Sequence, residues 1–365
     1  MDEPPDPNAS DGKWRAGRQE LVQRLERDGV PSAEVERHAQ QGTLFYLAAE
    51  RAISSIERFT VEDVARRAGV DVDFILAARR ALALPISESA TYVSADVEAV
   101  RIAALAGRAG ISPEEMVELL RALARGLKPA AEVARALVLR LALTPRMTEA
   151  ELADAYGAVA EELHGLLTPL VTNLLTLYLR EIPETEAISA AHLTAGRLTG
   201  ARRIAVCFVD LVGYTRIGEH TEPRALADLS LELEAIVQAS IYNPVQLVKT
   251  IGDATMLISP EDDTLLDIAL DVQRAVSERG GDFPPVRVGV ATGDALLRGG
   301  DWFGPPVNLA SRITAIARPD SILVHDATRR AARSERFRWS YVGTRRIRGL
   351  SAPVALYRLR RAEHR

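Results

Sequence analysis

Apolar residues recur with two different periods along the chain. From residue 13 to residue 182 they follow helical spacing with few strand signals between them, which predicts an all-helical domain. From residue 202 to residue 365, short apolar runs alternate with helical stretches, which predicts a second domain and an α+β fold class. Residues 1–12 combine prolines and acids with almost no apolar side chain, as a disordered tail does. The polar and small residues of 183–201 predict a linker.

The predicted elements of the second domain begin in the order strand, helix, strand, strand, helix, strand. This order is typical of a ferredoxin-like βαββαβ core. After the strand that begins at Arg202, we expect helices over 215–241, 262–279 and 306–316, and strands around Val248 and Thr255, over 286–291 and 321–324, and around Phe337 and Val354.

Helix start signals recur in the first domain. At three places a Ser or Thr is followed three residues later by an acid, the spacing of a capping box. These are Thr60 with Asp63, Ser112 with Glu115 and Thr148 with Glu151. Residues 60–84 read as helix, glycine-containing turn and second helix, the pattern of a helix-turn-helix. Acids balance the arginines of this segment and leave no positive surface for DNA, so we favour a packed helical hairpin.

The segment 165–179 is apolar on most of its faces, and Pro169 predicts a break or kink within it. A helix of this kind has to be buried in a core or an interface. A dimer seam and an apolar groove for a lipid-sized ligand are both open. The apolar run is too short and too interrupted to cross a bilayer, so no membrane span is expected.

Composition narrows the class of protein. With 365 residues, of which 47% are hydrophobic and 26% charged, the chain suits about two globular domains. A net charge of −5 gives no indication of a nucleic-acid partner. Cys207 is the single cysteine, which excludes an intrachain disulfide and fits a reducing, cytoplasmic setting.

Two carboxylates stand at the ends of predicted strands. In RRIAVCFVDLVGYT, residues 202–215, the apolar alternation places Asp210 at a strand end, and the turn after it opens a helix whose free N–H groups could face an anion. In QLVKTIGDATMLIS, residues 246–259, a Gly-Asp turn places Asp253 at a second strand end. Such a pair supplies the hard oxygen ligands that Mg²⁺ or Mn²⁺ prefers.

A third motif, DWFGPPVNLASR, covers residues 301–312. Its prolines suit a helix start, and Asn308 and Arg312 lie four apart, on one face of that helix. In chain order, F-x-D-L-x-G-Y-T, K-T-I-G-D and D-W-F-G-x-x-V-N-x-A-x-R resemble the catalytic domain of class III nucleotide cyclases, specifically adenylate cyclases, over residues 201–361. The helical domain resembles the regulatory domain that precedes the cyclase domain in some actinobacterial adenylate cyclases.

This resemblance implies an enzyme that converts ATP to 3′,5′-cyclic AMP and pyrophosphate at a homodimer interface, with two Mg²⁺ or Mn²⁺ ions per active site. It implies that Asp210 and Asp253 bind the ions together with the carbonyl of Leu211. By the same resemblance, Asn308 orients the ribose and Arg312 stabilises the charge of the transition state.

The substrate contacts follow from the resemblance as well. Lys249 and Asp301 would read adenine, as a donor to a ring nitrogen and an acceptor from the amino group. Arg348 stands where the family usually has a lysine for the outer phosphates. The turn after Asp210 would contribute to phosphate binding through its backbone, at Gly213, Tyr214 and Thr215.

Shared sites make the activity sensitive to subunit placement, so we expect the helical domain to restrain the enzyme until a signal arrives. His164, in the apolar helical region, and His192, in the linker, could provide a pH response. A fatty acid or another apolar ligand in the helices is the competing signal. A catalytically weak nucleotide-binding sensor and a DNA-binding regulator are the alternative functions.

Overall fold

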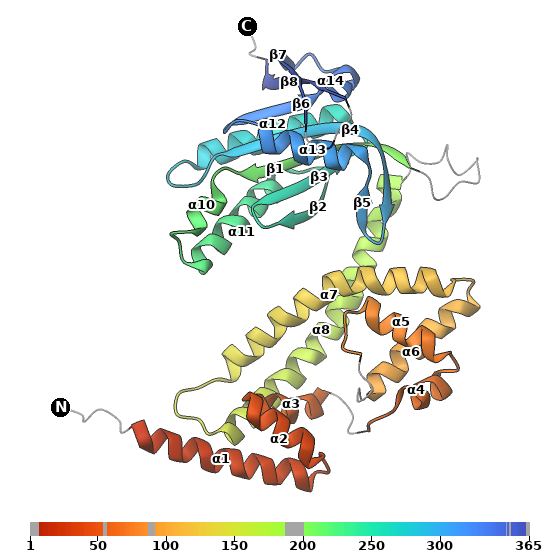
Figure 1. Cartoon of the computed structure of the whole chain (residues 1–365), viewed down its shortest axis with the longest axis vertical. Coiled ribbons are helices and arrows are strands. Elements are labelled where there is room, and N and C mark those ends of the chain that lie inside the picture. The colour runs from red at the N-terminus through yellow and green to blue at the C-terminus, as the bar shows by residue number, and fades with distance from the viewer. Residues whose placement is uncertain are drawn as a thin grey trace, which may run out of the picture. The chain divides into compact units, whose positions relative to one another are not determined.

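The computed structural model describes residues 7–53, 57–86, 92–186, 201–347, 349 and 352–362. The chain separates into two compact units, Met1–Arg180 and Glu181–Arg365, which are described one at a time below (Figure 1). The first is helical, and the second is built around a mixed sheet. No helix in the described ranges combines the length and the apolarity needed to cross a membrane.

The first unit contains eight described helices. They are α1 (Pro7–Arg27), α2 (Ser32–Gln41), α3 (Leu44–Ile53), α4 (Val61–Ala68), α5 (Val72–Ala81), α6 (Ser94–Arg108), α7 (Pro113–Ala142) and α8 (Glu149–Glu186). Helix α1 begins at Pro7, inside the segment predicted to be disordered, since proline is tolerated in the first turn of a helix.

Helix α8 continues through Pro169, so the predicted break at this residue is wrong. Proline in a helix removes one backbone hydrogen bond. The hydroxyl groups of Thr168, Thr172 and Thr176 each donate to the carbonyl four residues earlier, and these side chains therefore hydrogen-bond within the helix rather than interrupt it.

The core of this unit joins α1, α2 and α3 to the start of α8. Leu21, Leu25, Leu44 and Leu47 are almost fully buried there. The buried carboxylate of Glu149, at the start of α8, accepts a hydrogen bond from Nε of Arg18 at 2.6 Å. These contacts hold the first turns of α8 against α1.

Helices α4 and α5 form the hairpin expected over residues 60–84. The Thr60 capping box is present, and Gly69 ends α4 in the left-handed conformation. The capping boxes at Ser112 and Thr148 are present as well. Arg67 stacks on the ring of Phe59, and this arginine is therefore engaged within the hairpin.

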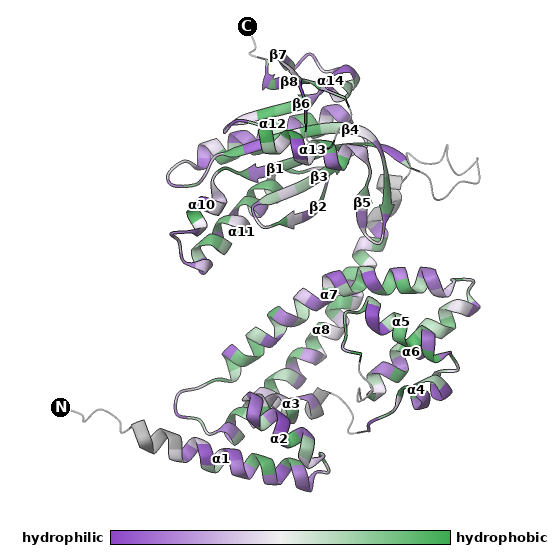
Figure 2. Ribbon diagram, viewed as in Figure 1, coloured by the Kyte–Doolittle hydropathy of each residue, from purple (hydrophilic) through white to green (hydrophobic). Residues whose placement is uncertain are grey.

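The second half of α8 exposes a long apolar surface. Its large side chains from Leu166 to Leu179 include eight that are 40–66% exposed, and Figure 2 shows hydrophobic residues along much of this helix. Apolar surface of this extent on one helix marks an interaction surface.

The second unit is an eight-stranded sheet with helices on both faces. Its strands are β1 (Arg202–Leu211), β2 (Gln246–Ile251), β3 (Ala254–Ser259), β4 (Val286–Arg298), β5 (Asp301–Phe303), β6 (Ser321–His325), β7 (Phe337–Arg345) and β8 (Val354–Arg361). Its helices are α10 (Tyr214–Gly218), α11 (Pro223–Ser240), α12 (Asp262–Arg279), α13 (Pro305–Ile316) and α14 (Asp326–Ala331).

The strand order is β2-β3-β1-β4-β6-β8-β7, with β5 paired to the far end of β4. The β4–β6 pair is parallel and the other pairs are antiparallel. The predicted helix over 215–241 is wrong in one respect, because it is divided into α10 and α11 before Pro223, whose missing N–H and fixed φ suit a new helix start. The prediction omits β5 and α14 and ends β4 too early.

Strand β1 lies inside the sheet and separates two cores. Its odd-numbered residues from Ala205 to Leu211 face the core that α11 and α12 cover. Its even-numbered residues from Ile204 to Phe208 face the core that α13 covers. Side chains alternate along a strand, so Asp210 belongs to the face covered by α13.

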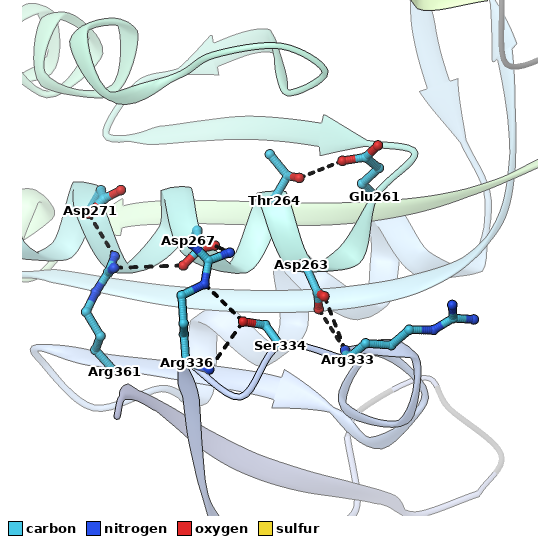
Figure 3. A network of polar contacts seen from close by, with 9 residues as sticks. All are labelled: Glu261, Asp263, Thr264, Asp267, Asp271, Arg333, Ser334, Arg336 and Arg361. Atoms are coloured by element: carbon cyan, nitrogen blue, oxygen red, sulfur yellow. Dashed lines mark hydrogen bonds and ion pairs between the residues drawn. The ribbon is translucent and has the colours of Figure 1, made fainter. Parts of the chain in front are cut away.

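Helix α12 is fixed to the C-terminal hairpin through a row of acids (Figure 3). Oδ2 of Asp267 lies 2.6 Å from Nη2 of Arg336, just before β7. Asp271 accepts a hydrogen bond from Arg361, at the end of β8, at 2.9 Å. Since Phe337 and Arg361 are register partners, the ends of β7 and β8 are held to the same helix.

Candidate active site

The two predicted metal ligands lie at neighbouring chain reversals. Asp210 is at the end of β1, and Asp253 occupies the turn between β2 and β3. The N–H of Leu211 donates to the carbonyl oxygen of Asp253 at 3.0 Å. Burial raises the pKa of Asp210, an effect that Arg287 opposes and the carboxylate of Asp253 reinforces. The two carboxylates therefore lie close to each other, and both are partly buried.

A third charged group lies beside this pair, the guanidinium of Arg287. The sequence alone did not predict it. Arg287 is the register partner of Asp210 across the β1–β4 ladder. Its Nε lies 2.5 Å from Oδ2 of Asp210, and its Nη1 donates to the carbonyl of Ala315 at the end of α13 at 3.1 Å. The sequence signal that could have identified this residue is its charge, which interrupts the apolar run that begins at Val286.

The donor set suits a hard divalent ion. Asp210 and Asp253 offer carboxylate oxygens, and an ion between them would offset their mutual repulsion. Among the residues that the structure describes, no group of three or more His, Cys, Asp or Glu side chains forms a complete cage. Mg²⁺ and Mn²⁺ are commonly held by one or two carboxylates together with waters and substrate phosphates, so two acids fit such an ion.

The turn after Asp210 is only partly open to an anion. The Val212 N–H already donates to the carbonyl of Pro285 at 2.8 Å, and the Leu211 N–H to Asp253. The expectation of free N–H groups is therefore wrong for these two residues, because carbonyl groups of the β2–β3 turn and of the residue before β4 accept their hydrogen bonds. Gly213 has a φ of 78°, and Thr215 is exposed. Tyr214 directs its hydroxyl to the carbonyl of Leu226 at 3.0 Å, so only its backbone faces the turn.

Lys249 and Asp301 are brought together as an ion pair. Nζ of Lys249 lies 2.5 Å from Oδ2 of Asp301, and the other oxygen of Asp301 accepts the Trp302 N–H at 2.9 Å. The β2–β3 register shifts between Leu247 and Lys249. Such a bulge re-aims the side chain that follows it, here Lys249.

Asn308 and Arg312 both lie on α13. Asn308 is exposed, whereas Nη1 of Arg312 is buried and has no hydrogen-bond partner in the described part of the chain. A Cβ added at Gly349 would stand 2.3 Å from this Nη1, so the backbone of Gly349 lies against the guanidinium. Arg348 lies outside the described residues.

The candidate groups form three separate sets. Among the described residues, no hydrogen bond or ion pair joins the Asp210 carboxylate to the Lys249–Asp301 pair or to Arg312. Of the two predicted regulatory histidines, His164 is exposed on α8, and His192 lies outside the described residues.

The helical unit contains a cavity of about 730 Å³ between α3, α7 and α8. Its walls are largely apolar, with a few polar groups among them. The lining residues are Tyr46, Ala49, Glu50, Ala131, Ala134, Arg135, Val138, Tyr156, Ala160, Leu163, His164 and Leu167. Burial raises the pKa of the Tyr156 hydroxyl, and Arg135 opposes this shift.

Comparison with known proteins gives two family matches. Residues 8–182 match the adenylate cyclase regulatory domain, and residues 198–361 match the adenylate and guanylate cyclase catalytic domain. The chain is 36% identical over 363 residues to a pH-sensitive adenylate cyclase of Mycobacterium tuberculosis, covering 97% of this chain and 90% of the relative. It is 34% identical over 289 residues to an adenylate cyclase of Streptomyces griseus, covering 74% and 67%.

Two solved structures match less than half of this chain. The crystal structure of the adenylyl cyclase CyaB from P. aeruginosa is 21% identical, with a TM-score of 0.39, over 46% of this chain and 97% of that one. A cyclase structure from Silicibacter pomeroyi is 27% identical, with a TM-score of 0.39, over 44% and 97%.

Proposed function

The chain belongs to the class III adenylate cyclases that carry an N-terminal regulatory domain, and from this premise we propose that it forms 3′,5′-cyclic AMP by two-metal catalysis at sites shared between two copies. The observation that supports the metal site best is the meeting of Asp210 and Asp253 at neighbouring strand ends, with burial raising the pKa of Asp210.

The reaction requires the ribose 3′-hydroxyl to attack the α-phosphate while pyrophosphate leaves. When bound, Mg²⁺ or Mn²⁺ would activate the attacking oxygen and neutralise charge on the phosphates. Asp210 and Asp253, with the carbonyl of Leu211, would hold the ions. Asn308 would orient the ribose, and Arg312, whose buried Nη1 has no partner among the described residues, would stabilise charge on the α-phosphate.

Lys249 and Asp301 would recognise the adenine. The ammonium group donates to a ring nitrogen and the carboxylate accepts from the amino group, whereas guanine presents the opposite polarity. Arg348 and the turn at Gly213, Tyr214 and Thr215 would contact the phosphates.

Two observations support a homodimer with shared sites. The three sets of candidate groups have no polar contact with one another in the described part of the chain, and α8 exposes a large apolar surface that a second copy could cover. The acids would come from one subunit. The other subunit would supply Lys249, Asp301, Asn308 and Arg312.

Mixed dimers test this arrangement. Asp210→Ala and Arg312→Ala chains should each be inactive, and co-refolded mixtures should regain about a quarter of the wild-type activity, because half of the dimers would contain one intact site of two. Mass spectrometry of tagged chains confirms that mixed dimers form. If they form and stay inactive, the sites are not shared.

Direct assay tests the metal ligands. The full chain should form cyclic AMP from ATP with Mg²⁺ or Mn²⁺, and Asp210→Ala or Asp253→Ala should lower turnover by at least about a thousandfold, since the loss of an ion ligand would leave the α-phosphate without the Lewis acid that polarises it. Asp228→Ala, an exposed acid of α11, is the control. Binding of ATP without turnover by the wild type would favour a nucleotide-binding sensor.

The helical unit would restrain the cyclase and release it on acidification or on binding of an apolar ligand. A relative is described as pH-sensitive, and His164 lines the apolar cavity. A fatty acid would place its chain among the alanines and leucines and its carboxylate near Arg135 or His164. These contacts would connect both signals to α8, the last described helix before the catalytic unit in the chain.

Activity of the full chain between pH 8 and pH 6 tests this regulation. We expect the activity to rise several-fold as the pH falls, and to rise less in His164→Asn. The control is His220→Asn, which changes an exposed histidine of the catalytic unit and should show the same rise as the wild type. Residues 200–365 alone should be more active and less pH-dependent. The same specific activity and pH profile in that fragment and in the full chain would refute restraint by the helices.

A further inference from the structure

The segment that follows Asp210 and the turn that carries Asp253 are each hydrogen-bonded to the same helix, α11. The hydroxyl of Tyr214, in the turn after Asp210, donates to the carbonyl of Leu226 at 3.0 Å. The hydroxyl of Ser230 donates to the carbonyl of Gly252, immediately before Asp253. Leu226 and Ser230 are four residues apart, so both contacts fall on one turn of one face of α11.

The Ser230 contact fixes backbone directly before Asp253, and the Tyr214 contact holds the start of α10, four residues after Asp210. The carbonyl of Gly252 belongs to the peptide plane that ends at Cα of Asp253, so the Ser230 hydrogen bond restricts how Asp253 leaves the turn. Gly252 has a φ of 60°. Glycine adopts this left-handed conformation readily because it has no Cβ. The Ser230 hydroxyl therefore adds a side-chain contact to the one that the Leu211 N–H makes with the carbonyl of Asp253.

Helix α11 is a rigid base for this purpose. Leu233 and Val237 are fully buried against the sheet. They lie about one and two helical turns after Ser230. The side chain of Ser230 is only partly buried, and it contributes little to that core. Its hydroxyl is thus available for positioning, while the fold is stabilised by other residues.

We propose that Ser230 and Tyr214 are positioning residues that set the spacing of Asp210 and Asp253 for the divalent ion. This inference rests on the proposed metal site. Neither hydroxyl touches the ion or the nucleotide; each acts through backbone at the neighbouring turn. Removal of one hydrogen bond of this kind should weaken ion binding by about three- to tenfold.

Ser230→Ala and Tyr214→Phe in the full chain test the proposal, since each removes a hydroxyl and keeps the side-chain packing. The readouts are binding of Mn²⁺ alone, followed by the electron paramagnetic resonance signal of the free ion, and the Mn²⁺ dependence of cyclic AMP formation. Both variants should bind Mn²⁺ about three- to tenfold more weakly, and Ser230→Ala should recover most of its turnover at saturating Mn²⁺. Ser230→Thr, which keeps a hydroxyl, should restore binding.

Ser240→Ala is the matched control, because Ser240 lies on the same helix and its hydroxyl donates to the Ile236 carbonyl at 2.8 Å. It should leave Mn²⁺ binding unchanged. Wild-type Mn²⁺ affinity in both Ser230→Ala and Tyr214→Phe would overturn the inference, as would equal weakening by Ser240→Ala. If the wild-type chain forms cyclic AMP but binds no Mn²⁺, the proposed metal site itself is wrong and the inference falls with it.

Discussion

Nζ of Lys249 lies 2.5 Å from Oδ2 of Asp301, although the two residues are 52 positions apart in the chain. One comes from β2, after its bulge, and the other from the short strand β5 that folds back on β4. A donor and an acceptor are thereby placed side by side. A purine edge that binds here has to present an acceptor to Lys249 and a donor to Asp301.

The first prediction exchanges these charges. The double variant Lys249→Glu with Asp301→Lys keeps an ion pair and reverses the positions of donor and acceptor. We expect the ratio of kcat/KM for ATP over GTP to fall by about a hundredfold, since each mismatched contact with a charged group costs about 1.5–3 kcal/mol. Lys249→Gln alone, which removes the charge without reversing polarity, should change this ratio less. An unchanged ratio in the double variant would contradict base recognition by this pair.

The second prediction concerns Gly349. A Cβ added to this residue would stand 2.3 Å from Nη1 of Arg312. Gly349→Ala should displace the guanidinium and lower kcat by about tenfold or more, because small displacements of a transition-state contact are costly. Gly343→Ala is the matched control. Gly343 also has a positive φ, of 113°, but a Cβ there would meet no atom within 4 Å. Equal loss of kcat in both variants would assign the effect to backbone strain and not to Arg312.

The third prediction concerns Arg287, whose guanidinium engages Asp210. Arg287→Gln removes a competitor for the carboxylate and also a positive charge beside the phosphates. Mn²⁺ should therefore bind a few-fold more tightly, while KM for ATP rises by about tenfold. Arg336→Gln, which breaks a pair with Asp267 in the hairpin anchor, is the control. Unchanged Mn²⁺ affinity and KM in Arg287→Gln would show that this arginine has no part in the site.

The fourth prediction uses His325, a half-buried histidine at the end of β6. Burial lowers the pKa of His325 below its ordinary value of 6.5, with Asp326 opposing the shift and Arg330 adding to it. The Nδ1 atom is buried without a hydrogen-bond partner among the described residues. The unfolded chain therefore binds this proton more readily than the folded one, so the stabilising contribution is present above pH 6.5 and is lost as the pH falls below it.

His325→Asn should consequently reduce the loss of thermal stability between pH 7.5 and pH 5.5. The measurement is the Tm of the full chain by scanning calorimetry at both pH values. His220→Asn, which changes an exposed histidine of the same unit, should behave as the wild type does. An equal fall of Tm in His325→Asn and in the wild type would contradict the assignment.

Local patterns in the sequence were sufficient for most of the elements, although not for β5 and α14, and for the positions of the two carboxylates. Short-range signals predict the positions of Asp210 and Asp253: the end of an apolar strand for the first and a Gly-Asp turn for the second. The structure has both residues at strand ends. The all-helical first domain, the order of the α+β domain and the capping box at Thr60 depend on neighbouring residues in the same way. The family followed from three ordered motifs for the same reason.

Tertiary structure decided which distant side chains meet. Arg287 faces Asp210 only because β1 and β4 pair in one register, and a shift by one residue would turn the arginine to the other face. Ser230 reaches Gly252 only because α11 packs beside the β2–β3 turn. Helix α8 continues through Pro169, where local propensity predicts a break. Register and packing are cooperative, long-range properties, and no periodicity within one segment encodes them.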